Sequence, residues 1–153
     1  MPYRRRSIVL AEVERQCRYI LKAYRETAAA AATRDEASLW YALDALLIGA
    51  ARLHQLLWPR PNPAVAWAAE LRAALAIGID SPLANKQLES ALDLAALADE
   101  WILRPDGGPR WFDRELSALR YYGRVFELAP LLIAVADLEA RAAREMRHMR
   151  EMV

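Results

Sequence analysis

The chain has 153 residues, of which 56% are hydrophobic and 27% are charged, and its formal net charge is +1. This length suits one domain with its own core, so residues 1–153 are expected to form a single helical domain. The nearly balanced charge argues against general electrostatic attraction to nucleic acid. Cys17 is the only cysteine, which excludes an intramolecular disulfide and a cysteine zinc site. No apolar run reaches the roughly 18 residues of a membrane span and no secretory signal is visible, so we expect a cytoplasmic protein without a membrane partner.

The first part of the chain has helical periodicity. Apolar residues spaced by three and four predict a helix from about Ser7 to Ala32. Thr33-Arg34-Asp35-Glu36 has the pattern of a capping box, in which Thr33 and Glu36 satisfy free N–H groups at the start of a second helix that reaches about Trp58. The short connection predicts an antiparallel pair. The expected buried stripes are Leu10, Val13, Cys17, Ile20 and Tyr24 in the first helix, and Leu39, Leu43, Leu46, Ala50, Leu53 and Leu57 in the second.

Prolines and glycines divide the middle of the chain. The stiff segment 58–63 contains three prolines and ends the second helix. A third helix is expected from about Pro63 to Ala76, closed by Gly78. Asp80 or Ser81 would then cap a fourth helix, with Pro82 near its first position, that continues to about Leu103.

The C-terminal third follows a breaker at residues 104–109. Residues 116–122 and 124–128 flank Gly123, and a small β-hairpin is favoured there over a helical turn and a bend. A last helix is expected from about Pro130 to Met152. The predicted fold class is therefore all-α, an up-down bundle of about five helices, with a small β-hairpin before the last one. The expected buried stripe of the last helix is Leu131, Val135, Leu138, Ala142, Met146 and Met149.

The predicted fourth helix is apolar on two sides. Such a helix is either central in its bundle or shared with a partner, so a homodimer is expected. The candidate interface residues on one face are Leu83, Leu94, Leu97 and Trp101. Glu89 and Asp93 are four residues apart on the polar strip, but no Glu-x-x-His motif accompanies them, so a solvated acidic strip is favoured over a metal site. No metal or cofactor is expected.

Several motifs, in their order along the chain, resemble one bacterial group of the HEPN superfamily. They are Trp40-Tyr41-Ala42-Leu43, Leu56-Leu57-Trp58-Pro59, Asp80-Ser81-Pro82-Leu83, Asp99-Glu100-Trp101 and residues 123–132. The resemblance implies a dimeric helical bundle, often a metal-independent ribonuclease of toxin–antitoxin or phage-defence systems. Such enzymes use an Arg and a His four to six residues later. The matching positions here are Glu89, Ser90 and Leu94.

Glu89 would repel the phosphate that an Arg binds, and Leu94 cannot transfer a proton. The resemblance therefore implies a non-catalytic protein that acts by dimerisation or by binding a partner protein. Two alternatives stay open. One is a ribonuclease with a relocated site, for which Arg141, Arg144 and His148 on one face of the last helix are the candidates; the arginines of this helix are also candidates for RNA binding. The other is a small-molecule binder with a pocket lined by Trp40, Trp67 and Trp101. His54 is expected at the edge of the core with one hydrogen bond.

Overall fold

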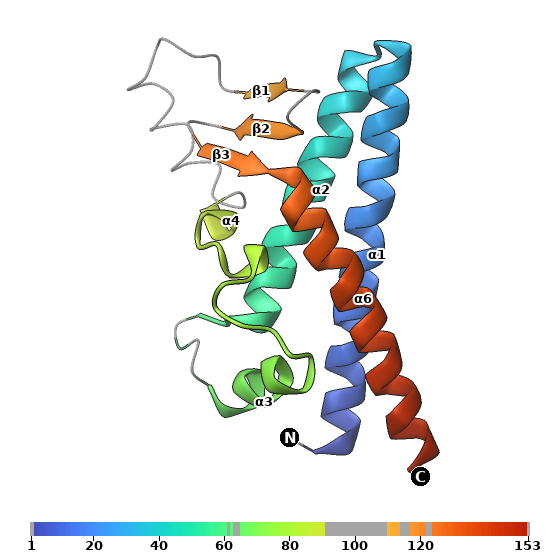
Figure 1. The fold of residues 1–153 in the computed structure, drawn as a ribbon, viewed down its shortest axis with the longest axis vertical. Helices are drawn as coiled ribbons and strands as arrows, with labels where there is room; N and C mark the ends of the chain where they lie inside the picture. Colours follow the sequence, from blue (N-terminus) through green and yellow to red (C-terminus); the bar gives the residue numbers. More distant parts are fainter. Residues whose placement is uncertain are drawn as a thin grey trace.

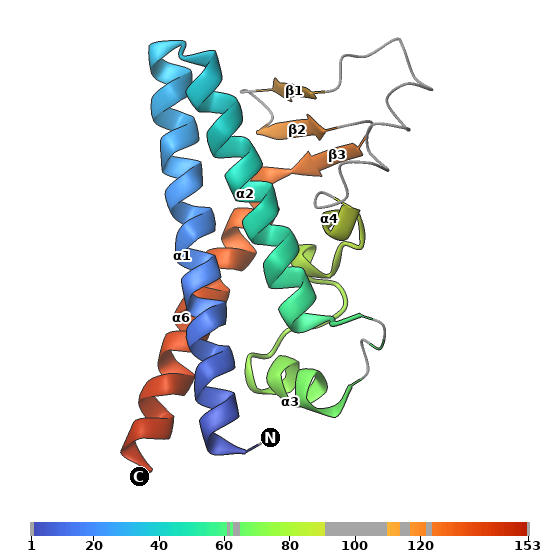
Figure 2. The same cartoon turned by 180° about the vertical axis from the view of Figure 1, so that it is seen from behind.

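A computed structural model describes residues 2–60, 62, 65–90, 110–113, 117–121 and 124–152. Three long helices dominate this part of the chain, namely α1 (Tyr3–Thr33), α2 (Glu36–Leu57) and α6 (Leu128–Glu151). Figures 1 and 2 show α1 and α2 side by side and antiparallel, with α6 packed across them so that both chain ends lie at one end of the molecule. The helical fold class is confirmed. A small antiparallel sheet is added at the other end.

The core is built from the stripes that the periodicity predicts. Leu10, Val13, Cys17 and Ile20 are fully buried on α1, and all six stripe residues of α2 are buried. On α6, Leu131, Val135, Leu138, Ala142 and Met149 are buried. Two predicted stripe residues, Tyr24 of α1 and Met146 of α6, are only partly buried and pack against the core. Complete burial of a Leu or Ile side chain stabilises the fold by roughly 1.5–3 kcal/mol, so these stripes fix how the long helices pack.

The close packing of α1 on α2 depends on Gly49. A Cβ atom at this position would lie 2.7 Å from Cγ1 of Ile20, closer than real carbon contacts allow. The absence of a side chain at Gly49 therefore lets the two helices approach each other at this point.

The turn between α1 and α2 differs from the predicted capping box. Thr33 still belongs to α1, and its hydroxyl donates to the carbonyls of Ala29 and Ala30 at 3.2 Å each. Asp35 is the residue that caps α2, because its carboxylate accepts the Ser38 N–H at 3.1 Å and the Ser38 hydroxyl at 2.6 Å. The prediction that Thr33 and Glu36 form the cap was wrong, since the left-handed Arg34 moves the start of α2 two residues onward.

The segment after α2 contains α3 (Ala66–Ala74), the 3₁₀ turn η1 (Pro82–Ala84) and α4 (Gln87–Ser90). In α3 the described helix is shorter than the predicted one. It ends because Ala76 has a φ of 49°, so Ala76 rather than Gly78 makes the left-handed turn. This conformation is strained for a residue with a Cβ atom.

The predicted continuous helix from Ser81 to Leu103 was wrong in its first part. Ser81 does cap a turn, accepting the Leu83 N–H at 3.3 Å, but that turn is η1 and it stops at Asn85. Asn85 is extended (φ −63°, ψ 111°), and its side-chain oxygen accepts the Gln87 N–H at 2.9 Å, which starts α4 as a new helix. Asn side chains compete with the backbone in this way, and here the competition breaks the helix. Residues 91–109, with the rest of the prediction, lie outside the described residues.

The sheet has the order β1-β2-β3, with β1 (Arg110–Asp113), β2 (Ala118–Tyr121) and β3 (Arg124–Glu127) all antiparallel. The β2–β3 pair confirms the predicted hairpin, and β1 is a strand that the sequence did not reveal. Leu119 pairs with Phe126, and both are buried, as is Tyr121. One face of the hairpin therefore closes the end of the core.

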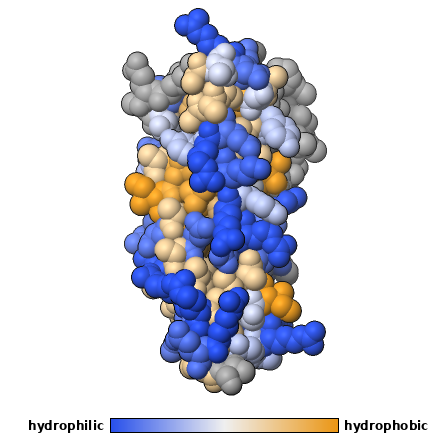
Figure 3. All heavy atoms as spheres, turned by 90° about the vertical axis from the view of Figure 1, so that its right-hand side faces the viewer, coloured by the Kyte–Doolittle hydropathy of each residue, from blue (hydrophilic) through white to orange (hydrophobic). Residues whose placement is uncertain are grey.

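The last helix begins at Leu128, two residues before the predicted start, with Pro130 in its first turn where a missing N–H costs little. Ion pairs between Arg6 and Glu145 and between Arg18 and Glu139 join α6 to α1. On the side of the molecule drawn in Figure 3, hydrophilic side chains are interleaved with weakly hydrophobic ones, and the strongly hydrophobic spots are separate. None of the described helices combines the length and apolarity that crossing a membrane requires.

Candidate functional site

The last turn of α2 meets the segment 81–90 around a buried histidine. His54 is 2% exposed. Its Nδ1 lies 2.7 Å from the Leu83 carbonyl oxygen, and its Nε2 lies 3.2 Å from Oε1 of Glu89. Trp58, one helical turn further on, stacks on the imidazole with ring centroids 5.3 Å apart. Both ring nitrogens and one ring face of His54 are thus used within the protein.

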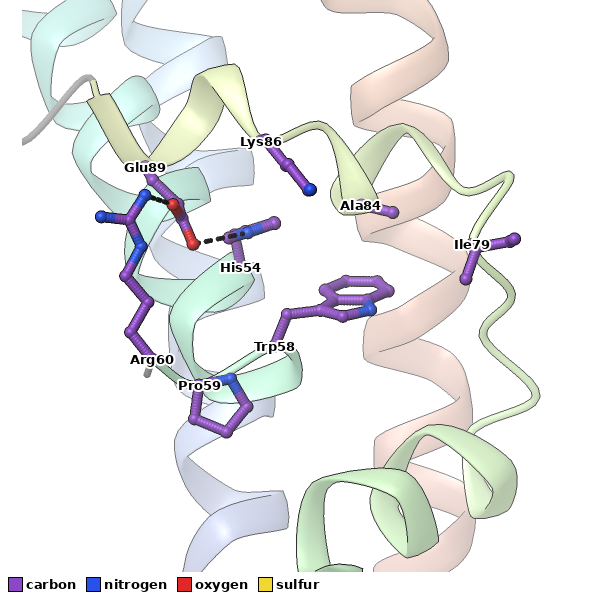
Figure 4. Close-up of a pocket in the computed structure, with 8 residues that line it drawn as sticks. All are labelled: His54, Trp58, Pro59, Arg60, Ile79, Ala84, Lys86 and Glu89. Atoms are coloured by element: carbon purple, nitrogen blue, oxygen red, sulfur yellow. Dashed lines mark hydrogen bonds and ion pairs between the residues drawn. The ribbon is translucent and has the colours of Figure 1, made fainter. Parts of the chain in front are cut away.

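Each carboxylate oxygen of Glu89 faces another side chain. Oε1 faces His54, and Oε2 forms an ion pair with the guanidinium of Arg60 from the loop that follows α2. The Glu89 side chain is 11% exposed, whereas that of Arg60 is 73% exposed. The three side chains therefore tie α4 to the end of α2, with Glu89 in the middle (Figure 4).

The hydrogen bonds of His54 decide where its proton lies. A carbonyl oxygen can only accept, so Nδ1 carries a proton and donates to Leu83. In the neutral ring Nε2 is then a lone pair that faces the Glu89 oxygen. Burial lowers the pKa of His54, the positive charge of Arg60 lowers it further, and the hydrogen bond to Leu83 opposes them. A hydrogen bond between Nε2 and Glu89 thus requires a second proton in the pair.

A pocket of about 620 Å³ opens beside this cluster. Its volume is in the range of small-molecule sites, about 300–1,000 Å³. Figure 4 shows Lys86 pointing from its loop toward the space near Trp58, with Glu89 and Arg60 on one side and Ile79 on the other. The described residues that line it are His54, Trp58, Pro59, Arg60, Ile79, Ala84, Lys86 and Glu89.

The chemistry that the pocket offers is binding rather than proton transfer by His54. The imidazole is almost completely covered, with Nδ1 bonded to Leu83 and Nε2 facing Glu89, so a ligand meets Glu89, Lys86 and apolar surface instead. Across the described residues, no group of three or more His, Cys, Asp or Glu side chains comes together as a metal site requires. Polar groups at fixed positions beside apolar walls are typical of a site for an organic molecule.

The residues matched to the HEPN motif have different positions in the structure. Glu89 lies in the pocket, and Ser90 is the last described residue of α4. Leu94 lies outside the described residues, as do the interface candidates Leu97 and Trp101. Leu83, the remaining interface candidate, is 1% exposed within the single chain, because the break at Asn85 places it in the core of this chain. Leu83 therefore offers no surface to a second copy in this conformation.

The three candidates on the last helix are separated by their environments. Arg141 is held by the fold, because its Nη1 donates to the carbonyls of Leu75 and Ala76 at 3.0 and 2.7 Å and its Nη2 lies 2.5 Å from Asp137. Arg144 and His148 are exposed.

Sequence reasoning missed the pocket. It predicted one hydrogen bond for His54 at the edge of the core, but His54 is buried and has two contacts. Trp40 and Trp67 pack against the core and do not line this pocket, and Trp101 is outside the described residues. The available signal was the i, i+4 spacing of His54 and Trp58 with Arg60 just beyond, which places an imidazole, an indole and a guanidinium at one helix end.

Comparison with known proteins gives no relative on which to base a function. No family model, no curated protein and no solved structure matches the chain. The functional argument therefore depends on the pocket itself.

Proposed function

We propose that this protein is a small-molecule-binding helical bundle whose ligand occupies the pocket beside His54. The observation that carries the proposal is the 620 Å³ cavity, which combines apolar walls with charged groups held in place. Trp58, Pro59, Ile79 and Ala84 supply the apolar contact. Sites for organic ligands have this composition, with a few polar groups that fix the orientation.

The rigidity of one wall supports the proposal. Glu89 is held by its ion pair with Arg60, and the imidazole beside it is held by the hydrogen bond from its Nδ1 to the Leu83 carbonyl. A ligand therefore finds this wall already formed and does not have to order it, which removes part of the entropic cost of binding. Ile79 is 90% exposed at the rim, and covering it would add apolar burial.

A fragment screen by ligand-observed NMR tests this proposal. Hits that bind the unmodified protein should bind more weakly to Ile79→Ala, because the apolar rim of the pocket is lost. Ile133→Ala is the matched control, since Ile133 is also exposed (71%) but lies on α6 and does not line the pocket. Hits that weaken equally in both variants, or the absence of any hit, would contradict the proposal.

The function implied by the HEPN resemblance stays a separate proposal. It is a non-catalytic bundle that forms homodimers or binds a partner protein, in the cytoplasm of a bacterium and in a defence or toxin–antitoxin setting. Light scattering tests the dimer, and a strict monomer would count against it. Its ribonuclease alternative is tested with labelled RNA, where cleavage should be lost in His148→Ala.

A further inference from the structure

The charges around the pocket do not cancel. Arg60 and Glu89 form an ion pair with each other, and burial keeps His54 toward its neutral form by lowering its pKa. Lys86 remains. Within the part of the chain that the structure describes, no carboxylate pairs with its ammonium group. The described residues of the pocket lining therefore carry one positive charge in excess.

The position of Lys86 makes this charge relevant to a ligand. Lys86 is exposed, lines the pocket and points into it in Figure 4. The Glu89 carboxylate, the only anion among the described lining residues, is paired with Arg60 and is 11% exposed. A positively charged ligand would thus have to displace Arg60, while a negatively charged one meets an unpaired cation.

The apolar residues around Trp58 indicate what the uncharged part of the ligand is like. One face of the indole stacks on His54, and the guanidinium of Arg72 lies 5.5 Å from the ring centroid. The indole lines the pocket together with Pro59, Ile79 and Ala84. Such walls favour a ligand with an apolar body.

We propose that the ligand is a small organic carboxylate with one negative charge, whose carboxylate binds Lys86 and whose apolar body packs between Trp58, Ile79 and Ala84. This inference rests on the proposed function of the pocket. One negative charge neutralises the excess of the lining, whereas a dianion such as a phosphate monoester would leave a new excess of the opposite sign.

Three probes of the same shape and different charge test the ligand class, namely 3-phenylpropionate, 3-phenylpropionamide and 3-phenylpropylamine. The carboxylate should bind about five-fold more tightly than the amide, the ratio expected for one solvent-accessible ion pair. Lys86→Gln should remove this preference. Lys22→Gln is the matched control, because Lys22 is the only other lysine and lies on α1, 3.6 Å from Glu26.

The presence of just two lysines also allows the site to be located directly. Reductive methylation with ¹³C-formaldehyde keeps the charge and labels Lys22, Lys86 and the α-amino group. Adding 3-phenylpropionate should shift the Lys86 signal and leave that of Lys22 unchanged.

The outcomes separate the ligand class from the function. Equal binding of the acid and the amide, or a preference for the amine, would overturn the proposal that the ligand is a carboxylate. The proposal that the pocket binds a small molecule would stand. Shifts of the Lys22 signal alone would also overturn it. If neither these probes nor any fragment of the screen binds, both the ligand class and the proposed function fail.

Discussion

Nε2 of His54 and Oε1 of Glu89 lie 3.2 Å apart although 35 residues separate them in the sequence. Because Nδ1 donates to the Leu83 carbonyl, the neutral imidazole presents a lone pair to the carboxylate. The contact becomes a hydrogen bond when a second proton enters the pair. Burial of the imidazole opposes the uptake of that proton in the folded protein, so folding is coupled to pH even though the proton would add this one hydrogen bond.

The first prediction concerns this coupling. Burial, and after it the charge of Arg60, lowers the pKa of His54 in the folded protein below its ordinary value of 6.5. The unfolded chain therefore takes up a proton at higher pH than the folded chain does. The stability that His54 contributes is complete above about pH 6.5 and falls as the pH drops from 6.5 through the lower pKa of the folded state. Urea denaturation between pH 7.5 and 5 should show the free energy of unfolding decreasing toward acid.

His54→Asn provides the test, because its amide can still donate to Leu83 but cannot titrate. This variant should be less stable at pH 7.5 and should have a flatter pH dependence below 6.5. The chain has one other histidine, His148, which is exposed on α6, so His148→Asn is the matched control. A decrease toward acid that survives in His54→Asn and disappears in His148→Asn would refute the assignment.

The second prediction separates two arginines of α6. Arg141 donates to the carbonyls of Leu75 and Ala76, just where the chain turns with the left-handed Ala76. Arg141→Ala should lower the free energy of unfolding by about 1–2 kcal/mol, since charged donors to carbonyls are lost at a half-buried site. Arg144→Ala, one turn along the helix at an exposed position, should change it by less than about 0.5 kcal/mol. Chemical denaturation of both variants measures the difference, and equal values would show that the Arg141 contacts contribute nothing.

The third prediction concerns the approach of α1 to α2. Gly49→Ala places a methyl group 2.7 Å from Cγ1 of the fully buried Ile20. Overpacking of this kind costs about 1–3 kcal/mol, more than the roughly 1 kcal/mol that Ala gains over Gly in a helix. The variant should therefore unfold at lower denaturant concentration.

A double-mutant cycle isolates this contact. Ile20→Ala removes the Cγ1 atom, so adding Gly49→Ala to it should be neutral or stabilising relative to Ile20→Ala alone. An Ala at position 49 that costs the same in both backgrounds would mean that some other neighbour causes the strain.

The parts of the fold that follow from local periodicity could be predicted from the sequence. Leu10 and Leu43 are buried because residues spaced by three and four share a helix face, and that spacing is visible in any window of the chain. The hairpin could be anticipated for a similar reason. The break at Asn85 could not, because the same side chain is compatible with a helix until its oxygen binds the Gln87 N–H.

The candidate site was beyond sequence reasoning for a different reason. The sequence singled out Glu89 only as one of two carboxylates on a polar strip and as the position where a family motif has an Arg. Its contacts with His54 and Arg60 depend on how the loop after α2 and the segment 81–90 pack together, and no local pattern encodes this packing. The pocket is therefore a property of the tertiary structure.

The last prediction distinguishes the two possible caps of α2. Asp35→Ala should lower the unfolding midpoint at pH 7, because its carboxylate accepts the Ser38 N–H. Thr33→Val should leave the midpoint nearly unchanged, since the Thr33 hydroxyl bonds carbonyls of its own helix. The hydrogen bonds from Ser38 lower the pKa of Asp35 below its usual 3.8, so the contribution of Asp35 is present above that value and is lost as the pH falls through the lowered pKa. Thermal unfolding of both variants at pH 7 and pH 2 measures these midpoints. A larger loss for Thr33→Val than for Asp35→Ala would show that Thr33, as the capping box predicts, is the residue that caps α2.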